Sequence, residues 1–252
     1  MKNKFLFLMM IVLCTGLAMS CGGEDFEDEE MEDGNPTSMD NGGRSLYVFG
    51  DSWADQMDDG QFQQELADRG YGDTVQVVPF GIGGTTMEGW ANDEDEILSE
   101  MLEAISEDPN SDPIVFFTLA GNDILDNGSA ENVPTDMREL LTQLEDSRDD
   151  LQIVYAQYDI MNLESEDCAD LFDSILGITE PLALSNLWLD LYASAEQVAA
   201  DFDRVTAVNT YGSLQGNPGN PDLGTWSPEE YFADCIHLND DGYDIYLDAV
   251  FD

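Results

Sequence analysis

Short apolar runs alternate with amphipathic segments from about residue 45 to the end of the chain. The runs have the length of single strands and lie at residues 46–49, 74–80, 114–119, 151–158 and 205–211. The segments between them repeat apolar residues at helical spacing. The run at 114–119 is apolar throughout, as expected for a central strand buried on both faces. Strands separated by helices predict an α/β fold with one five-stranded parallel sheet.

Right-handed crossovers place the connecting helices on both faces of such a sheet, which makes a three-layer α/β/α sandwich. Helical spacing predicts helices at residues 55–69, 92–107 and 136–148, a short and a long helix within 167–203, and a last helix from residue 241. We find no internal repeat in the sequence. We therefore expect one folded domain over residues 45–252.

Residues 1–20 have the pattern of an export signal. Lys2 and Lys4 give a positively charged start, and residues 5–17 are apolar. This apolar stretch is too short to span a bilayer. We therefore expect residues 1–20 to be a signal peptide that is removed from the mature protein.

Cys21 directly follows this segment and a small residue, Ser20. The junction resembles the lipobox of bacterial lipoproteins, in which the cysteine is lipidated and becomes the mature N-terminus. The usual leucine stands one position early, at Leu17. The resemblance implies a lipid anchor on the bacterial cell envelope, at the outer membrane or the cell surface. The alternative is a periplasmic or secreted protein with Cys21 as a free thiol.

Residues 21–44 predict a disordered acidic tether. The stretch 24–33 is almost entirely acidic, and turn-forming residues follow it without any apolar period. A segment of this composition cannot bury enough apolar surface to fold. We expect it to hold the folded domain away from the envelope surface.

The charge of the chain excludes several kinds of partner. There are 7 Lys and Arg against 55 Asp and Glu, for a formal net charge of −48. Binding to nucleic acid through its phosphates is excluded, and contact with a membrane is expected only through a lipid anchor. The shortage of lysine suggests adaptation to high salt, which screens self-repulsion. The alternative is a general solubility bias, and melting temperatures that do not rise with salt would favour it.

Two cysteines lie in the predicted domain, Cys168 and Cys235. In an oxidising compartment an isolated pair predicts a disulfide. Such a bond would be worth up to about 4 kcal/mol on the chain-entropy model, because it closes a long loop. The alternative is two separate buried thiols.

Three of the predicted strands end in polar or glycine-rich turns. These turns are Gly50-Asp51-Ser52-Trp53, residues 81–86 and Ala120-Gly121-Asn122-Asp123. The carboxyl ends of parallel strands lie at one edge of the sheet, where α/β folds bind ligands, so we expect the turns to meet. The chain's single histidine, His237, follows the fifth strand and is expected above the same edge.

The residues at this edge fit acyl transfer. Ser52 needs a base to act as a nucleophile, and His237 is the only imidazole available. Asp234, three residues before it, is expected to fix the tautomer of His237. An oxyanion could be held by the backbone N–H of Ser52, an N–H of the glycine loop and the side-chain amide of Asn122. Asp51 is expected to brace the turn rather than to act in the chemistry.

These blocks, in this order, resemble the SGNH/GDSL hydrolase superfamily of esterases and lipases. Gly50-Asp51-Ser52 matches the first block, Gly121-Asn122-Asp123 the third and Asp234-x-x-His237 the fourth. The glycine loop matches the second block, and its register implies Gly84 as the N–H donor. The resemblance implies a flavodoxin-like sandwich with strand order 2-1-3-4-5. Trp53 stands where the family name has a leucine.

The resemblance implies an exported serine hydrolase that cleaves carboxylic esters through an acyl-enzyme and needs no cofactor. The expected substrate is a small-molecule or polymer ester, and we expect a monomer. Carbohydrate O-deacetylation at the same site is one alternative, and a non-catalytic surface binding lipoprotein is another. The acidic run at 93–96 lacks the spacing of a calcium loop, so no metal is expected.

Three tryptophans lie near the predicted active edge. Trp53, Trp90 and Trp226 could form the walls of a pocket for the acyl or alcohol part of a substrate. For each of them, packing in the core is an equal alternative. The sequence does not choose between lipid esters and sugar esters.

Overall fold

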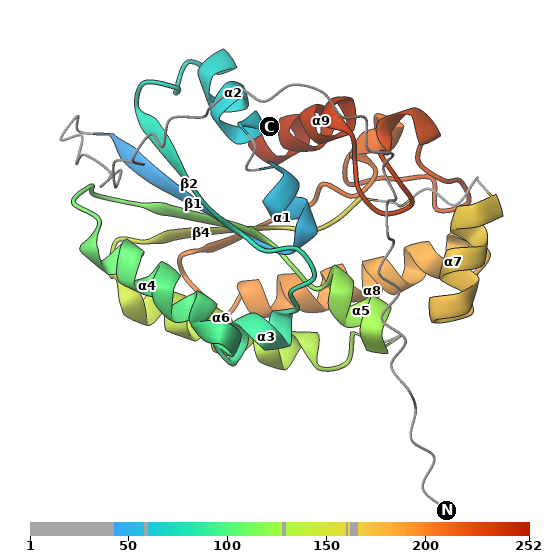
Figure 1. The fold of residues 1–252 in the computed structure, drawn as a ribbon, viewed down its shortest axis with the longest axis horizontal. Helices are drawn as coiled ribbons and strands as arrows, with labels where there is room; N and C mark the ends of the chain where they lie inside the picture. Colours follow the sequence, from blue (N-terminus) through green and yellow to red (C-terminus); the bar gives the residue numbers. More distant parts are fainter. Residues whose placement is uncertain (1–42, 58–59, 128–129, 160, 162–165) are drawn as a thin grey trace, which may run out of the picture. The chain divides into compact units, whose positions relative to one another are not determined.

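The described part of the chain is built around one parallel sheet with helices on both faces (Figure 1). The computed structural model describes residues 43–57, 60–127, 130–159, 161 and 166–252. The predicted signal peptide, Cys21 and nearly all of the predicted tether lie outside these residues. Within these ranges, no helix is long and apolar enough to cross a membrane.

The sheet has the order β2-β1-β3-β4-β5, and every neighbouring pair of strands is parallel. This confirms the predicted strand order. The strands are β1 (Arg44–Gly50), β2 (Val75–Gly81), β3 (Ile114–Thr118), β4 (Gln152–Ala156) and β5 (Val205–Val208). The apolar β3 lies at the centre, as its sequence predicted. Arg44, which we had assigned to the tether, is the first residue of β1 and pairs with Val75.

The helices form two outer layers (Figure 1). Helices α1, α2 and α9 cover one face of the sheet, while α3, α4, α6 and α8 cover the other. The bounds are α1 (Ser52–Met57), α2 (Gln61–Asp68), α3 (Met87–Ala91), α4 (Ile97–Glu107), α5 (Gly121–Asn127), α6 (Val133–Ser147), α7 (Glu166–Leu176), α8 (Pro181–Ala199) and α9 (Asp240–Phe251). The three-layer sandwich is therefore confirmed.

Helical spacing explains how each layer packs. In α6, Leu140, Leu141 and Leu144 are fully buried, because three- and four-residue steps return to the same side of a helix. On the opposite layer, Phe62 of α2 packs edge-on against Phe116 of β3, with ring centroids 4.8 Å apart. Burial of aromatic and branched side chains from both directions is the main force that holds helices to the sheet.

The helix expected at residues 55–69 is instead two helices, α1 and α2. Gly60 immediately precedes α2 and has a φ angle of 100°. This left-handed conformation is costly for residues with a side chain but not for glycine, so a continuous α-helix does not pass through it. Helix α1 is therefore a separate short helix, which follows β1 almost directly along the chain.

The structure also places short helices where we expected only turns. Helix α1 begins at Ser52, and α5 begins at Gly121, next to Asn122. Two of the predicted site residues therefore lie in the first turn of a helix that follows a strand. The first backbone N–H groups of a helix have no partner within that helix.

Candidate active site

The carboxyl ends of three strands meet at Gly50. It pairs with Gly81 of β2 and with Thr118 of β3. Its φ angle is 143°, and a Cβ at this position would lie 2.1 Å from the carbonyl oxygen of Thr118. Only glycine fits so close an approach of two backbones. The turn at Gly50 delivers Ser52 to the carboxyl edge of the sheet as the first residue of α1.

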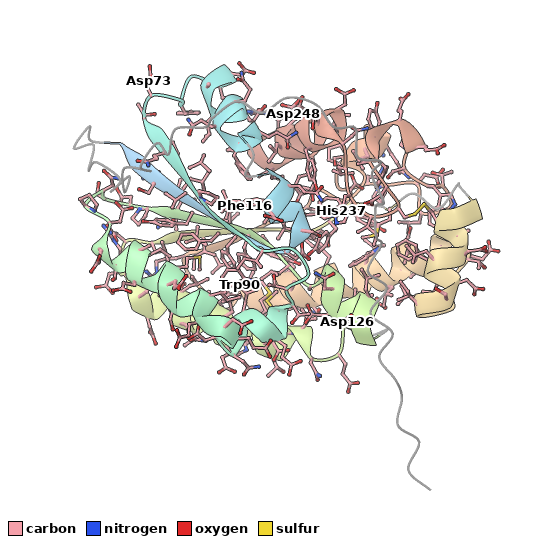
Figure 2. All side chains as sticks on the ribbon, in the orientation of Figure 1. Asp73, Trp90, Phe116, Asp126, His237 and Asp248 are labelled. Carbon is pink, nitrogen blue, oxygen red and sulfur yellow. A yellow bond between two sulfur atoms is a disulfide. The ribbon has the colours of Figure 1, made fainter. Side chains whose placement is uncertain are left out.

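The structure brings Ser52, His237 and Asp234 together as a hydrogen-bonded chain. Oγ of Ser52 lies 2.8 Å from Nε2 of His237, and Nδ1 of His237 lies 2.7 Å from Oδ2 of Asp234. An Nδ1–H that donates to Asp234 leaves Nε2 as an acceptor for the serine hydroxyl. This is the geometry that general-base activation of a serine requires. Figure 2 shows His237 beside α1.

Asp234 also shapes the loop that carries His237. Its Oδ1 accepts the backbone N–H of Ile236 at 2.7 Å and that of His237 at 2.8 Å. Burial acts to raise the pKa of Asp234. The hydrogen bonds from the His237 side chain and from these two amides outweigh burial and lower the pKa below its usual value. Asp234 is therefore charged at neutral pH and orients the imidazole.

Trp53 ties the histidine loop to α1. Its Nε1–H donates to the carbonyl oxygen of Ile236 at 3.1 Å, one residue before His237. The indole ring packs edge-on against Tyr158, Tyr243 and Tyr246. Trp53 is only 1% exposed, so the prediction that it walls an open pocket is wrong. The indole instead anchors the loop that carries His237.

Trp90 is likewise a core residue and not a pocket wall. It is fully buried, with its ring centroid 4.6 Å from that of Phe49. Its Nε1–H donates to Oγ1 of Thr85 at 2.9 Å. Trp226 is partly exposed and packs against the core, and its role in a pocket stays a prediction.

The disulfide predicted for Cys168 and Cys235 is present in the structure. Cys235 stands directly after Asp234 and two residues before His237, while Cys168 belongs to α7. The bond therefore fixes the loop with the acid and the base to a helix far away in the sequence. Together with the Trp53 hydrogen bond, it gives this loop two anchors on separate elements.

Asp51 directly precedes Ser52 and is 2% exposed. Its Oδ1 accepts the N–H of Trp53 at 3.1 Å, and its Oδ2 accepts the hydroxyl of Tyr158. Burial raises the pKa of Asp51 to about 7, although both of these hydrogen bonds act to lower it. Asp51 does not contact Ser52 as a base would. It braces the turn, as we predicted.

Asn122 connects α5 to the glycine loop. Its Nδ2 donates to the carbonyl oxygen of Thr85 at 2.8 Å and lies 3.5 Å from Oδ2 of Asp51. The second contact is at the limit of a hydrogen bond. The N–H that makes this weak contact is therefore the one that could donate to an oxyanion instead. The structure places Asn122 at the correct edge, and its role as a donor stays a prediction.

The glycine loop lies next to the nucleophile. A Cβ added at Gly83 would lie 3.8 Å from Cβ of Ser52. The peptide bond that follows Gly83 carries the N–H of Gly84, whose φ angle of 82° suits glycine. Gly84 therefore lies in the segment that the family resemblance implied, and its role as a donor also stays a prediction.

Sequence reasoning missed the part played by Tyr158. Its hydroxyl holds Asp51, its ring packs on Trp53, and a Cβ at Gly121 would lie 3.0 Å from its Cζ atom. One signal could have found it, because Tyr158 closes the apolar run of the fourth predicted strand. That position puts it at the same sheet edge as Ser52.

No set of three or more metal-ligating side chains occurs among the described residues.

Comparison with known families gives a match that covers most of the chain. The sequence matches the GDSL-like lipase/acylhydrolase family over residues 47–245. The chain belongs to this family. The matched region runs from β1 into α9 and includes Ser52, Asn122, Asp234 and His237. A comparison with curated protein sequences gives no match.

Several solved structures share the fold of this GDSL-family protein. A member of the lipolytic protein G-D-S-L family from Veillonella parvula has a TM-score of 0.54 and 18% identity, over 82% of this chain and 96% of that one. A catalytic mutant of an acetylxylan esterase from Geobacillus stearothermophilus has a TM-score of 0.57 and 15% identity, over 82% and 92%. An α/β hydrolase enzyme from the metagenome of Lake Arreo, Spain, has a TM-score of 0.53 and 16% identity, over 83% of this chain and 95% of that one.

The disulfide should stabilise this GDSL-family protein substantially. Replacing both cysteines, as Cys168→Ser with Cys235→Ser, opens a loop with a sequence separation of 67. We expect the free energy of unfolding to fall by about 4 kcal/mol, measured by chemical denaturation. A thiol reductant should lower the stability of the wild type toward that of the variant and leave the variant unchanged. Equal stability of variant and oxidised wild type would contradict this.

The buried acid Asp51 should make stability depend on pH. Because its folded pKa of about 7 lies above the unfolded value of about 4, the folded state keeps a proton that the unfolded chain has lost. This stabilisation is complete below about pH 4 and is lost as the pH rises to about 7. Relative to Asp51→Asn, the wild type should lose up to about 4 kcal/mol over this range.

Chemical denaturation of both proteins at a series of pH values measures this difference. The other acids titrate in both proteins, so their effects cancel in the comparison. A stability difference that stays constant between about pH 4 and pH 7 would show that Asp51 does not hold its proton there.

Proposed function

We propose that this GDSL-family hydrolase cleaves carboxylic esters through Ser52, His237 and Asp234. The observation that carries the proposal is the 2.8 Å contact between Oγ of Ser52 and Nε2 of His237, whose other nitrogen is held by Asp234. The nucleophile, the base and the acid that orients it are thus within direct reach of one another. Membership of a lipase and acylhydrolase family supports the same reaction class.

In the first step His237 takes the proton of Ser52 as Oγ attacks the ester carbonyl carbon. The carbonyl oxygen becomes an oxyanion, which the backbone N–H groups of Ser52 and Gly84 and the amide of Asn122 would stabilise. His237 then gives its proton to the leaving alcohol, and an acyl-enzyme remains. Asp234, charged at neutral pH, stabilises the imidazolium that forms between these two events.

In the second step water takes the place of the alcohol. His237 accepts a proton from this water, which attacks the carbonyl carbon of the acyl-enzyme. Return of the proton to Oγ of Ser52 releases the carboxylic acid and restores the starting state. Besides the ester and this water, the cycle uses side chains and backbone groups of this chain.

Two substrate classes fit this chemistry, simple acyl esters and acetyl groups on carbohydrate. We place acyl esters first because the matched family is one of lipases and acylhydrolases. The likeness in fold to an acetylxylan esterase makes acetylated xylan the second candidate. A panel of p-nitrophenyl esters of increasing acyl length beside acetylated xylan, at two salt concentrations, would rank them.

We further propose that the protein is exported and anchored through Cys21. The support is the sequence alone, with a charged start, a short apolar stretch and a cysteine before two glycines. Release of a Cys21→Ser variant from the membrane fraction, with the wild type retained there, is the expected result. Equal distribution of the two proteins would contradict the anchor.

The nucleophile is tested by Ser52→Ala. We expect kcat/KM for p-nitrophenyl acetate to fall by at least about 10³-fold, because only oxyanion stabilisation and binding would remain. Labelling by a fluorophosphonate probe should disappear. Ser106→Ala, on the exposed side of α4, serves as the matched control and should keep both properties. Retained labelling in Ser52→Ala would refute the assignment, and an unlabelled wild type would favour the non-catalytic alternative.

The oxyanion donor is tested by Asn122→Ala. We expect kcat to fall about 10²–10³-fold with little change in KM, because the lost interaction strengthens only in the transition state. Fluorophosphonate labelling should be slower yet still occur at Ser52. A variant that changes KM alone would assign Asn122 to substrate binding or to loop structure instead.

A further inference from the structure

A cavity of about 540 Å³ opens at the end of the sheet opposite to Ser52. It lies at the amino ends of the strands, beneath α2 and α9. Its walls include Leu46, Phe62, Leu66, Phe116, Val154 and Phe251. A volume of this size and an apolar lining with few polar groups are typical of sites that bind small molecules.

This cavity is separate from the site at Ser52. Arg44, at its mouth, is the first residue of β1, while Gly50, before the nucleophile, is the last. Six residues of extended strand place about 20 Å between them. Figure 2 labels Phe116 in the cavity wall and His237 in the other site, and the two lie apart along the sheet.

Arg44, at the mouth of the cavity, is held only weakly by its ion-pair partner. The guanidinium of Arg44 lies 3.6 Å from Asp112, beyond hydrogen-bond distance, and the two side chains are 48% and 53% exposed. An exposed pair of this kind contributes little energy. The contrast is Arg69, whose guanidinium lies over the ring of Phe251 and is held by Asp248 at 2.8 Å and Asp252 at 3.0 Å.

An apolar cavity with an available arginine at its mouth suits an amphiphile with an anionic head. A guanidinium binds a carboxylate through two parallel hydrogen bonds, and an unbranched hydrocarbon tail suits the apolar walls. We propose that this cavity binds a free long-chain carboxylic acid, with its carboxylate on Arg44 in the place of Asp112. The proposal does not depend on the function proposed for Ser52.

Calorimetric titration of laurate into the purified protein tests the proposal. The titration is made at a salt concentration high enough to screen the repulsion from a chain of net charge −48. We expect saturable binding at one site. Arg44→Gln should weaken it about tenfold, because a charge-assisted hydrogen bond is lost. Asp112→Asn should strengthen it, because the competing carboxylate is removed.

Both variants lie on the surface, so the fold should survive. Dodecanol has the same tail without the charge, and Arg44→Gln should leave its binding unchanged. Val250→Phe, in a residue of α9 that lines the cavity, should weaken the binding of both ligands by filling the space. The absence of saturable laurate binding would overturn the proposal, and so would equal affinity in the wild type, Arg44→Gln and Asp112→Asn. Laurate binding unchanged by Val250→Phe would place the ligand elsewhere and would also overturn it.

Discussion

The close approach of Gly50 to the carbonyl oxygen of Thr118 decides where Ser52 lies. Strand β1 lies between β2 and β3, so its end is the one point from which a residue can reach both neighbouring strand ends. The glycine turn places Ser52 at the start of α1, beside the loop of β2 and the first turn of α5. A side chain at position 50 would push β1 and β3 apart and separate the nucleophile from the groups arranged around it.

The elements set by local pattern were predictable from sequence, and those set by distant contacts were not. The apolar runs predicted the five strands, and the spacing of Asp234 and His237 predicted that their side chains lie close together. The break before α2 depends on Gly60, a local signal that a longer apolar period obscured. The burial of Trp53 could not be read from its neighbours, because its partner, the carbonyl of Ile236, lies 183 residues away. The link between Tyr158 and Asp51 is also remote in sequence, because the two residues are 107 positions apart.

Asp51 and Asp234 both lie near the site, and their different surroundings give the two carboxyl groups different roles. Burial beneath α1 raises the pKa of Asp51, whereas the amides and imidazole around Asp234 lower the pKa of that carboxyl. In a chain with 55 acidic residues, composition alone identifies neither of them. What distinguishes Asp234 is that it sits in the same turn as the imidazole and accepts the backbone amides of that turn.

Asp234 and His237 share one short loop, so the candidate site consists of two parts, this loop and Ser52 on α1. Asp234 and His237 are locked to each other by hydrogen bonds within four residues, and only their joint position relative to Ser52 can vary. The Trp53 indole and the Cys168–Cys235 bond attach this loop to α1 and α7. The residues just before Asp234 hold this loop further, because Ala233 donates its backbone N–H to the carbonyl oxygen of His237 at 2.9 Å and Phe232 pairs with Leu238. A movement of the loop would therefore carry Asp234 and His237 together, so it would change their distance from Ser52 and leave their own hydrogen bond intact.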